Sequence, residues 1–374
     1  LIMLVVLALH IRAQCDGGGY RWSFSTPGYD VIHEPVQHVN GDVYVLGFTN
    51  GIPGGMGHDL ALFRFSPDGG LQWAKTYHVS GDDGGMSSVL STGPSGALYL
   101  GGTMNGINTA SEDGSLVKLD EDGAVLWARS VLPLEHYCQV RAIAEAPNGD
   151  VLIAGSTNSI GAGLADAYVA RFTAVGTLLW LHAYGWSRQD HLTDLHVLED
   201  GSFIASSTTM GANGTARRGF VLSGSADGQL VQGEVHNAGS FLIYNRMLRN
   251  ADGTTLHIGE YASSGSTNYN VILTLTHSST GNVIWSRSYG TSASEQGLSA
   301  VSDGHTGWFV AAHQGTARAA YLLHVASNGD LLRTRSLQNT FFAAHSEWNR
   351  PLISTQDGSL LLAAASAGGP NAVL

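Results

Sequence analysis

Short runs of alternating apolar and polar residues follow one another along most of the chain, and turns rich in glycine separate them. Alternation with a period of two is typical of strands that bury one face. Residues 166–209 illustrate the pattern: they predict four short antiparallel strands, with turns at 174–176 and 199–201 and a longer polar loop, GWSRQDH, at 185–191. The chain is therefore expected to be all-β and built from hairpins.

Two signatures recur along the sequence. The first is a turn followed by a strand that ends in tryptophan, as in SPDGGLQW at 66–73. The second is a turn, usually Asp-Gly or Asn-Gly, followed by an apolar run, as in NGDVLIAGST at 148–157. Each occurs seven times, and successive copies of the first are 48 to 54 residues apart. Such turns favour hairpins because glycine accepts a positive φ without a steric clash.

Two hairpins in every fifty residues predict one four-stranded antiparallel blade, and seven copies predict a seven-bladed β-propeller. The residues that end the first signature are interpreted as packing anchors between neighbouring blades, since indole burial is strongly stabilising. The departures from tryptophan at Gln232 and Arg333 are expected to mark irregular blades. The predicted anchors are Trp22, Trp73, Trp127, Trp180 and Trp285.

The turn at 66–73 also fits an Asp-box through Ser66, Asp68, Gly70 and Trp73. No other copy keeps that spacing. A calcium site would need several convergent oxygen ligands, whereas each turn offers one or two aspartates. We therefore interpret the turns as structural.

The two ends of the chain are expected to close the ring together. The sequence CDGGG at 15–19 forms a turn before the strand YRWSF, and PNAVL at 370–374 resembles the start of strands such as NYNVIL at 268–273. Pairing of these ends would be a Velcro-type closure, which removes free sheet edges. The C-terminal strand is short, so the closing blade is predicted to be truncated at this end.

The first residues predict export. Residues 1–13 contain an apolar run that is too short to span a bilayer, and Ala13 offers a small residue for cleavage before Gln14. We therefore expect an N-terminally incomplete signal peptide at 1–13, a single propeller domain at 14–374, and a secreted or outer cell-surface location. Lipidation of Cys15 is a weaker alternative. Cys15 and Cys138 are expected to be unpaired, with Cys138 in a strand.

Charge narrows the range of partners. The net charge of −12 makes nucleic acid an unfavourable partner, and no later segment predicts a membrane span. No cofactor motif occurs. The sixteen histidines form no HxxxH or HxH pattern, so no metal site is predicted. A monomer is expected.

The repeated pattern, seen in ADAYVARFTAVGTLLWLHAYG at 165–185 and NYNVILTLTHSSTGNVIWSRSYG at 268–290, resembles secreted bacterial β-propeller repeat proteins of the Bacteroidetes type. In such proteins a sorting domain for type IX secretion often follows the propeller. The resemblance implies the architecture and no catalytic residues. The Thr-Gly turn before Trp285 also resembles quinoprotein dehydrogenase repeats, but in one copy alone.

Binding residues are expected on one side of the propeller. Connections between the second and third strands of a blade, and between blades, are longer and more varied than the other turns, and such loops carry function on rigid scaffolds. This side would also present His78, Glu135, Glu295, Phe342 and His345. The candidate ligand-binding residues are Asp82, Asp83, His136, Tyr137, Trp186, Arg188, Asp190, His191, Glu347 and Trp348.

Three functions remain open from the sequence. The favoured one is a secreted, non-catalytic binding or adhesion propeller that recognises a glycan or a protein, because no catalytic motif occurs. The second is an extracellular polysaccharide hydrolase or lyase with acids from Asp82, Asp83, Asp190 and Glu347, which would need carboxylates at a defined separation. The third is a structural spacer within a larger cell-surface protein.

Overall fold

Every regular element of the computed structural model is a β-strand, and the described residues contain no helix. None of them therefore forms a helix that could cross a membrane. The structure describes residues 3–5, 10–16, 19–25, 30–50, 59–78, 88–105, 112–132, 137–185, 188–210, 216–237, 239–316, 318–342, 350–366 and 372–373.

Consecutive strands pair antiparallel in sets of four, which we number as the first to sixth sheets. The first three sheets comprise β4 (Asp30–Gln37), β5 (Val43–Thr49), β6 (Asp59–Phe65) and β7 (Leu71–His78); β8 (Val89–Thr92), β9 (Leu98–Asn105), β10 (Glu112–Leu119) and β11 (Val125–Ser130); and β12 (Cys138–Glu145), β13 (Val151–Thr157), β14 (Asp166–Phe172) and β15 (Leu178–Tyr184).

The next three sheets continue the same order. They comprise β16 (Asp190–Val197), β17 (Phe203–Met210), β18 (Arg217–Gly224) and β19 (Leu230–His236); β20 (Phe241–Arg249), β21 (Thr254–Ala262), β22 (Asn270–His277) and β23 (Val283–Tyr289); and β24 (Glu295–Ser302), β25 (Trp308–Gln314), β26 (Ala319–Val325) and β27 (Leu331–Phe341). A single parallel pair, Arg217 with Phe241, joins the fourth sheet to the fifth.

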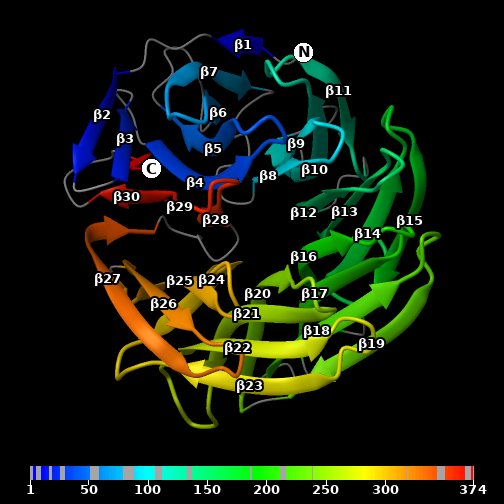
Figure 1. The fold of residues 1–374 in the computed structure, drawn as a ribbon. Coiled ribbons are helices and arrows are strands. Elements are labelled where there is room, and N and C mark those ends of the chain that lie inside the picture. Colours follow the sequence, from blue (N-terminus) through cyan, green and yellow to red (C-terminus); the bar gives the residue numbers. More distant parts are fainter. Residues whose placement is uncertain are drawn as a thin grey trace.

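The sheets follow one another around a central axis, with the first strand of each innermost and the last at the periphery (Figure 1). The strand ends that lead from the second strand to the third, and from one sheet to the next, lie on one side, which we call the loop side. The hairpin turns within each sheet lie on the other, which we call the turn side. This division matches the one predicted from the sequence.

The strands near the two ends of the chain pair with each other. β31 (Ala372–Val373) pairs antiparallel with β3 (Gly19–Ser25) and with β30 (Ala364–Ser366). β28 (Leu352–Ser354) pairs with β29 (Leu360–Leu362). Within the predicted leader, β1 (Met3–Val5) pairs with β7, and β2 (His10–Asp16), which begins there, pairs with β3.

The prediction that residues 166–209 form one blade is wrong. The four strands of this segment belong to two sheets, because β14 and β15 complete the third sheet while β16 and β17 begin the fourth. The structural unit starts at the strand that was expected to be third. A repeat period does not define where a unit begins. The pattern therefore predicted the strands but not which four of them form one sheet.

The hairpin turns on the turn side are stabilised internally. In the turn after β6, the Ser66 amide donates to the Gly70 carbonyl at 2.8 Å, and the Ser66 hydroxyl donates to Asp68. Gly69 has a φ of 83°, which a residue with a side chain rarely adopts. The aspartate thus bonds within its own turn, as the structural interpretation requires.

Indole groups on the outermost strands contact the turn of the following sheet. Trp127 donates through Nε1 to the Ala174 carbonyl at 3.1 Å, and Trp180 donates to Ala226 at 3.1 Å. Trp285 donates to Ser327 at 2.9 Å. Trp73 lies against Gly123 of the next turn. Each contact joins two neighbouring sheets, which is the position expected for a packing anchor.

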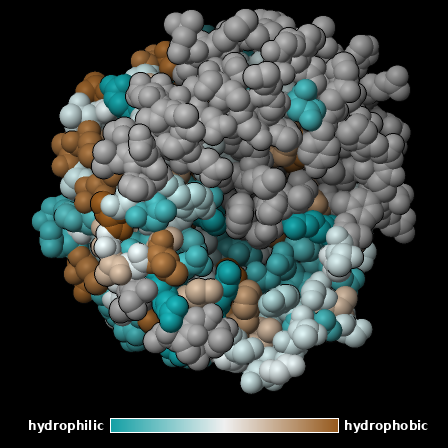
Figure 2. Space-filling view, turned by 180° about the vertical axis from the view of Figure 1, so that it is seen from behind, coloured by the Kyte–Doolittle hydropathy of each residue, from teal (hydrophilic) through white to brown (hydrophobic). Residues whose placement is uncertain are grey.

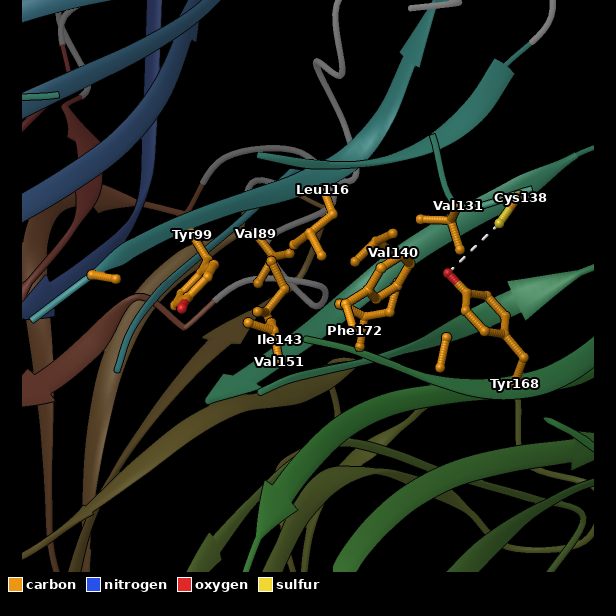
Figure 3. Close-up of a cluster of buried hydrophobic side chains, with 13 residues drawn as sticks. Val89, Tyr99, Leu116, Val131, Cys138, Val140, Ile143, Val151, Tyr168 and Phe172 are labelled. Atoms are coloured by element: carbon orange, nitrogen blue, oxygen red, sulfur yellow. Dashed lines mark hydrogen bonds between the residues drawn. The ribbon is translucent and has the colours of Figure 1, made fainter. Parts of the chain in front are cut away.

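The sheets are held together by apolar clusters. Figure 3 shows the cluster between the second and third sheets, where Cys138 donates through Sγ to the Tyr168 hydroxyl at 3.6 Å. Cys138 is buried in β12 with no disulfide. The thiol therefore packs as a small core residue.

The two departures from tryptophan behave differently. At Gln232 the side-chain amide donates to the Thr280 carbonyl, and the β18–β19 pairing has one register shift, as in most sheets. At Arg333 the β26–β27 pairing has two register shifts, and β27 extends over 11 residues. The expected irregularity is thus present at Arg333 and absent at Gln232.

Candidate functional site

Four of the predicted binding residues lie in the described part of the structure: Tyr137, Arg188, Asp190 and His191. Tyr137 and Arg188 are half-buried at the edge of the loop side. Burial, together with the charges of Arg141 and Arg217, lowers the pKa of His191 to about 3, so this imidazole is neutral at ordinary pH. Six predicted residues lie outside the described residues: Asp82, Asp83, His136, Trp186, Glu347 and Trp348.

Asp190 is located at the base of a loop. It is fully buried, and its amide donates to the Ala165 carbonyl at 2.8 Å. Asp166, also buried, accepts a hydrogen bond from the Gly163 amide at 2.9 Å. A Cβ at Gly185 would be 2.6 Å from an oxygen of each carboxylate, so both acids flank this glycine. They lie beneath the connection between the third and fourth sheets.

Sequence reasoning missed a group of charged side chains on the inner strands. Asp194 in β16 is fully buried and forms an ion pair with Arg350, just before β28. The amides of Leu195 and Met247 also donate to Asp194, each at 2.9 Å. In Figure 2 hydrophilic residues gather around the hollow at the middle of the molecule.

Glu34 and Arg246 belong to the same charged group. Glu34 in β4 is fully buried and accepts a hydrogen bond from the Leu90 amide at 2.9 Å. Arg246 in β20 donates to the Thr193 carbonyl at 2.6 Å. Burial raises the pKa of Glu34 to about 7, although the charges of Arg246 and Arg350 oppose this shift. For Asp194 the same two arginines outweigh the effect of burial and hold the pKa below its usual value.

A β-bulge places these acids next to the following sheet. The pairing of the first two strands shifts register between Ile32 and Glu34 and between Leu192 and Asp194. After these two bulges, Glu34 accepts the Leu90 amide and Asp194 accepts the Met247 amide of the next inner strand, and Ser299 in β24 accepts the Leu352 amide at 3.3 Å in the same way. Glu34 and Asp194 therefore connect neighbouring sheets, which is a structural use of a carboxylate.

We expect Glu34→Gln to change how stability depends on pH. A raised folded-state pKa gives stability that is present below about pH 4.5 and is lost as the pH rises through about 7. Between those limits the wild type should lose ~3 kcal/mol relative to the variant, at 1.4 kcal/mol per pKa unit. Urea unfolding of both proteins at pH 5 and pH 8 measures this difference, and identical pH dependences would contradict it.

A pocket of about 470 Å³ lies between the fifth and sixth sheets. Its wall is formed by β23 and the following Gly290 and Thr291 on one side and by β26 and β27 on the other. Thr291, Glu295, Gln314 and Ala319 all lie at strand ends or connections on the loop side. The volume is within the range of small-molecule sites, about 300–1,000 Å³.

The pocket combines aromatic, hydroxyl, amide and carboxylate groups. Tyr289 and Tyr321 line it together with Thr291, Gln314 and Ser336. Glu295, whose exposed fraction is 1%, lies at its base. Its Oε1 accepts hydrogen bonds from the Thr291 amide at 3.0 Å, the Thr291 hydroxyl at 2.5 Å and the Gln314 amide at 3.0 Å. Its Oε2 has no hydrogen-bond partner among the described residues.

No group of three or more histidine, cysteine, aspartate or glutamate side chains in the described part of the chain is close enough together to hold an ion. The described lining of the pocket offers hydroxyl groups from Tyr321, Thr291 and Ser336 and a carboxylate from Glu295.

The arrangement of the sheets defines the chain as a β-propeller, and solved structures agree. It is similar to the β-propeller domain of the trilobed protease from Pyrococcus furiosus, with a TM-score of 0.54 and 8% identity over 92% of each chain. It is also similar to a PL25 polysaccharide lyase, ulvan lyase, bound to -[GlcA(1-4)Rha3S]-, with a TM-score of 0.53 and 13% identity over 92% of this chain and 94% of that one.

A third similar structure is the acylaminoacyl peptidase of Pyrococcus horikoshii, with a TM-score of 0.54 and 9% identity. The match covers 92% of this chain and 50% of the peptidase, so the chain spans half of that protein's length. At such identities the likeness concerns the fold alone. No family model and no curated protein matches the chain.

Proposed function

We propose that the chain is a secreted, non-catalytic recognition propeller whose loop side binds a glycan. The observation that carries this proposal is the pocket between β23 and β27, because part of its lining lies at strand ends on the loop side and because hydroxyl, amide and tyrosine groups that contact sugars line it. The described carboxylates Glu34, Asp190 and Asp194 are buried within the scaffold. Export rests on the apolar segment at 1–13.

We also propose that the ring has seven blades with a Velcro-type closure. Six sheets are followed by β28, then β29 and β30, then β31, and the pairing of β31 with β3 would supply the fourth strand from the N-terminal region. A closed ring has no free sheet edge. It gives the loop side a rigid base on which binding groups keep their positions.

Cleavage of a polysaccharide is the second candidate. The observation that favours it is the pKa of Glu34, about 7, since a carboxyl that titrates near neutral pH suits general acid or base chemistry. The fold likeness to ulvan lyase is compatible with it. Recognition ranks first because Glu34 has no exposed surface and bonds to the Leu90 amide of the neighbouring strand.

The test separates the two candidates. The purified full chain is run in native gels that contain single soluble polysaccharides, and the same polymers are then incubated with it and examined for new reducing ends and unsaturated products. We expect retarded migration with at least one polymer and no products. Products that vanish in the Glu34→Gln variant would establish the second candidate instead, and migration unaffected by every polymer would overturn the glycan proposal.

A further inference from the structure

The pocket between the fifth and sixth sheets has polar features that the matching position of the fourth sheet lacks. In the fourth sheet, β18 and β19 pair Phe220 with Val235. In the sixth sheet, the equivalent pair is Tyr321 with Ser336. Two residues further along the strands, Leu222 pairs with Gly233, whereas Leu323 pairs with Thr334. Relative to the fourth sheet, hydroxyl groups thus replace apolar or missing side chains on this wall of the pocket.

The shape of β27 accompanies this change. Arg333 stands where β7, β11, β15 and β23 have tryptophan, and it is exposed. The end of β27 then pairs with β30, through Thr340 with Ser366 and Phe341 with Ala365. β27 therefore runs away from the fifth sheet toward the strands at the C-terminal end, and in Figure 1 it is the long curved strand at the periphery. This course leaves the space that the pocket occupies.

The base of the pocket has an unsatisfied acceptor. Three donors are used on Oε1 of Glu295, while Oε2 is buried and has no partner among the described residues. Leaving a buried polar atom unpaired costs free energy, so a ligand that donates a hydrogen bond to Oε2, once the lining side chains move enough to expose it, would gain affinity. Burial and the charge of Glu295 raise the pKa of Tyr321 above its ordinary value, so its hydroxyl stays protonated and can also donate to a ligand.

The charge of the pocket determines which class of hydrogen-bonding ligand it favours. Its described lining contains one carboxylate and no lysine, arginine or histidine. An acidic sugar would place a second negative charge near Glu295, with no cation in the described lining to compensate it, which is unfavourable at short range. A neutral sugar offers hydroxyl groups that donate to the carboxylate and accept from Tyr321, while its C–H faces pack on tyrosine rings; the two hydrogens of the Gln314 side-chain amide are already donated to Thr291 and Glu295. Tyr289 is held in place by donating to the Gly329 carbonyl at 2.6 Å.

We propose that this pocket, with Glu295 at its base, binds an uncharged saccharide unit and rejects uronic and sulfated sugars. The inference rests on the proposed function and specifies its ligand class and its site. Glu295 is the anchoring acceptor, and Tyr321 and Ser336 provide the hydroxyl groups on the β26–β27 wall.

Two variants test the site without removing its packing. Glu295→Gln keeps an oxygen for the three donors but turns the unpaired acceptor into a donor. The double variant Tyr321→Phe, Ser336→Val imitates the apolar pair of the fourth sheet. The control is Glu199→Gln, which removes the same negative charge at an exposed position on the turn side. Thermal unfolding of each variant reports whether the fold is kept.

The first measurement is the dissociation constant of each full-length protein for neutral polymers (a β-glucan, a xylan and a mannan) and acidic ones (alginate and polygalacturonate) by affinity electrophoresis. We expect the wild type and Glu199→Gln to bind a neutral polymer equally, and both pocket variants to bind it at least tenfold more weakly. Binding of acidic polymers alone, or neutral binding unchanged in the folded pocket variants, would overturn the inference while leaving glycan recognition in place.

The second measurement separates the inference from the proposed function. Saturation-transfer NMR is recorded with millimolar glucose, xylose and mannose on the wild type and on Glu295→Gln. A signal that the variant loses would support the pocket even if no polymer were retained, a result that overturns polysaccharide recognition alone. Absence of both polymer retention and monosaccharide signal would overturn both.

Discussion

Replacing Arg350 by methionine is expected to lower the free energy of unfolding by about 3 kcal/mol, because it leaves the fully buried Asp194 without its ion-pair partner. The side chain of Arg350 is 29% exposed, and Asp194 keeps its bonds to the Leu195 and Met247 amides, so we place the effect at the lower end of the range for broken buried pairs. Urea unfolding at pH 7 measures it.

The dependence of stability on acidic pH tests the Asp194–Arg350 ion pair independently. Asp194 has a lowered folded-state pKa, so its contribution is present above its unfolded pKa and is lost as the pH falls through the folded one. In Arg350→Met this pKa should rise, and the loss of stability on acidification should become smaller. Arg335→Met, an exposed change in β27, is the control. Equal stabilities of the two variants would contradict a role for the pair.

Replacing Gly155 by alanine is expected to cost about 3 kcal/mol, near the upper end for overpacking. A Cβ at this position in β13 would lie 1.8 Å from the carbonyl oxygen of Gln139, at the bulge of β12. The φ of Gly155 is not in the left-handed region, so the cost is steric and comes from forcing the bulge open.

The matched control is Gly233→Ala in β19. This glycine is exposed, and a Cβ there would meet nothing closer than the Phe220 ring at 3.1 Å. We expect less than about 1 kcal/mol from it. Thermal and urea unfolding of both variants provide the comparison, and equal effects at the two glycines would show that the close approach at the bulge is not what requires Gly155.

The repeat pattern predicted the strands because it rests on local chemistry. The alternation of apolar and polar residues, the glycine turns and the indole positions at Trp127, Trp180 and Trp285 can each be recognised within a single repeat. The grouping of strands into sheets was not local, because a repeat has no beginning of its own. The unit at 166–209 therefore joined the end of one sheet to the start of the next.

The charged group on the inner strands was not predicted because it depends on distant residues. Asp194 and Arg350 are 156 positions apart. A signal did exist: Glu34, Asp194, Arg246 and Ser299 occupy the same place after the register shift of their strands. An alignment of the repeats that allows for the bulge would have identified the group, because it places a polar residue at the same position of several strands that are otherwise rich in buried residues.

The pocket shows the same limit. Glu295 was expected on the loop side as one presented residue among many, whereas the structure buries it at the base of a pocket with Thr291 and Gln314. The exchange of Phe220 and Val235 for Tyr321 and Ser336 is visible in the sequence. That these two residues face each other follows only from the pairing of β26 with β27, and the sequence did not predict this pairing because the repeat is irregular at Arg333.

The measurement that tests the account most directly is hydrogen exchange of the full chain with and without a saturating polysaccharide. The account predicts added protection in the segments that line the pocket, at 289–297, 314–323 and 334–341, with unchanged exchange at the turn-side segments 199–201 and 225–229. Protection confined to the turn side, or spread evenly over all sheets, would contradict recognition through this pocket.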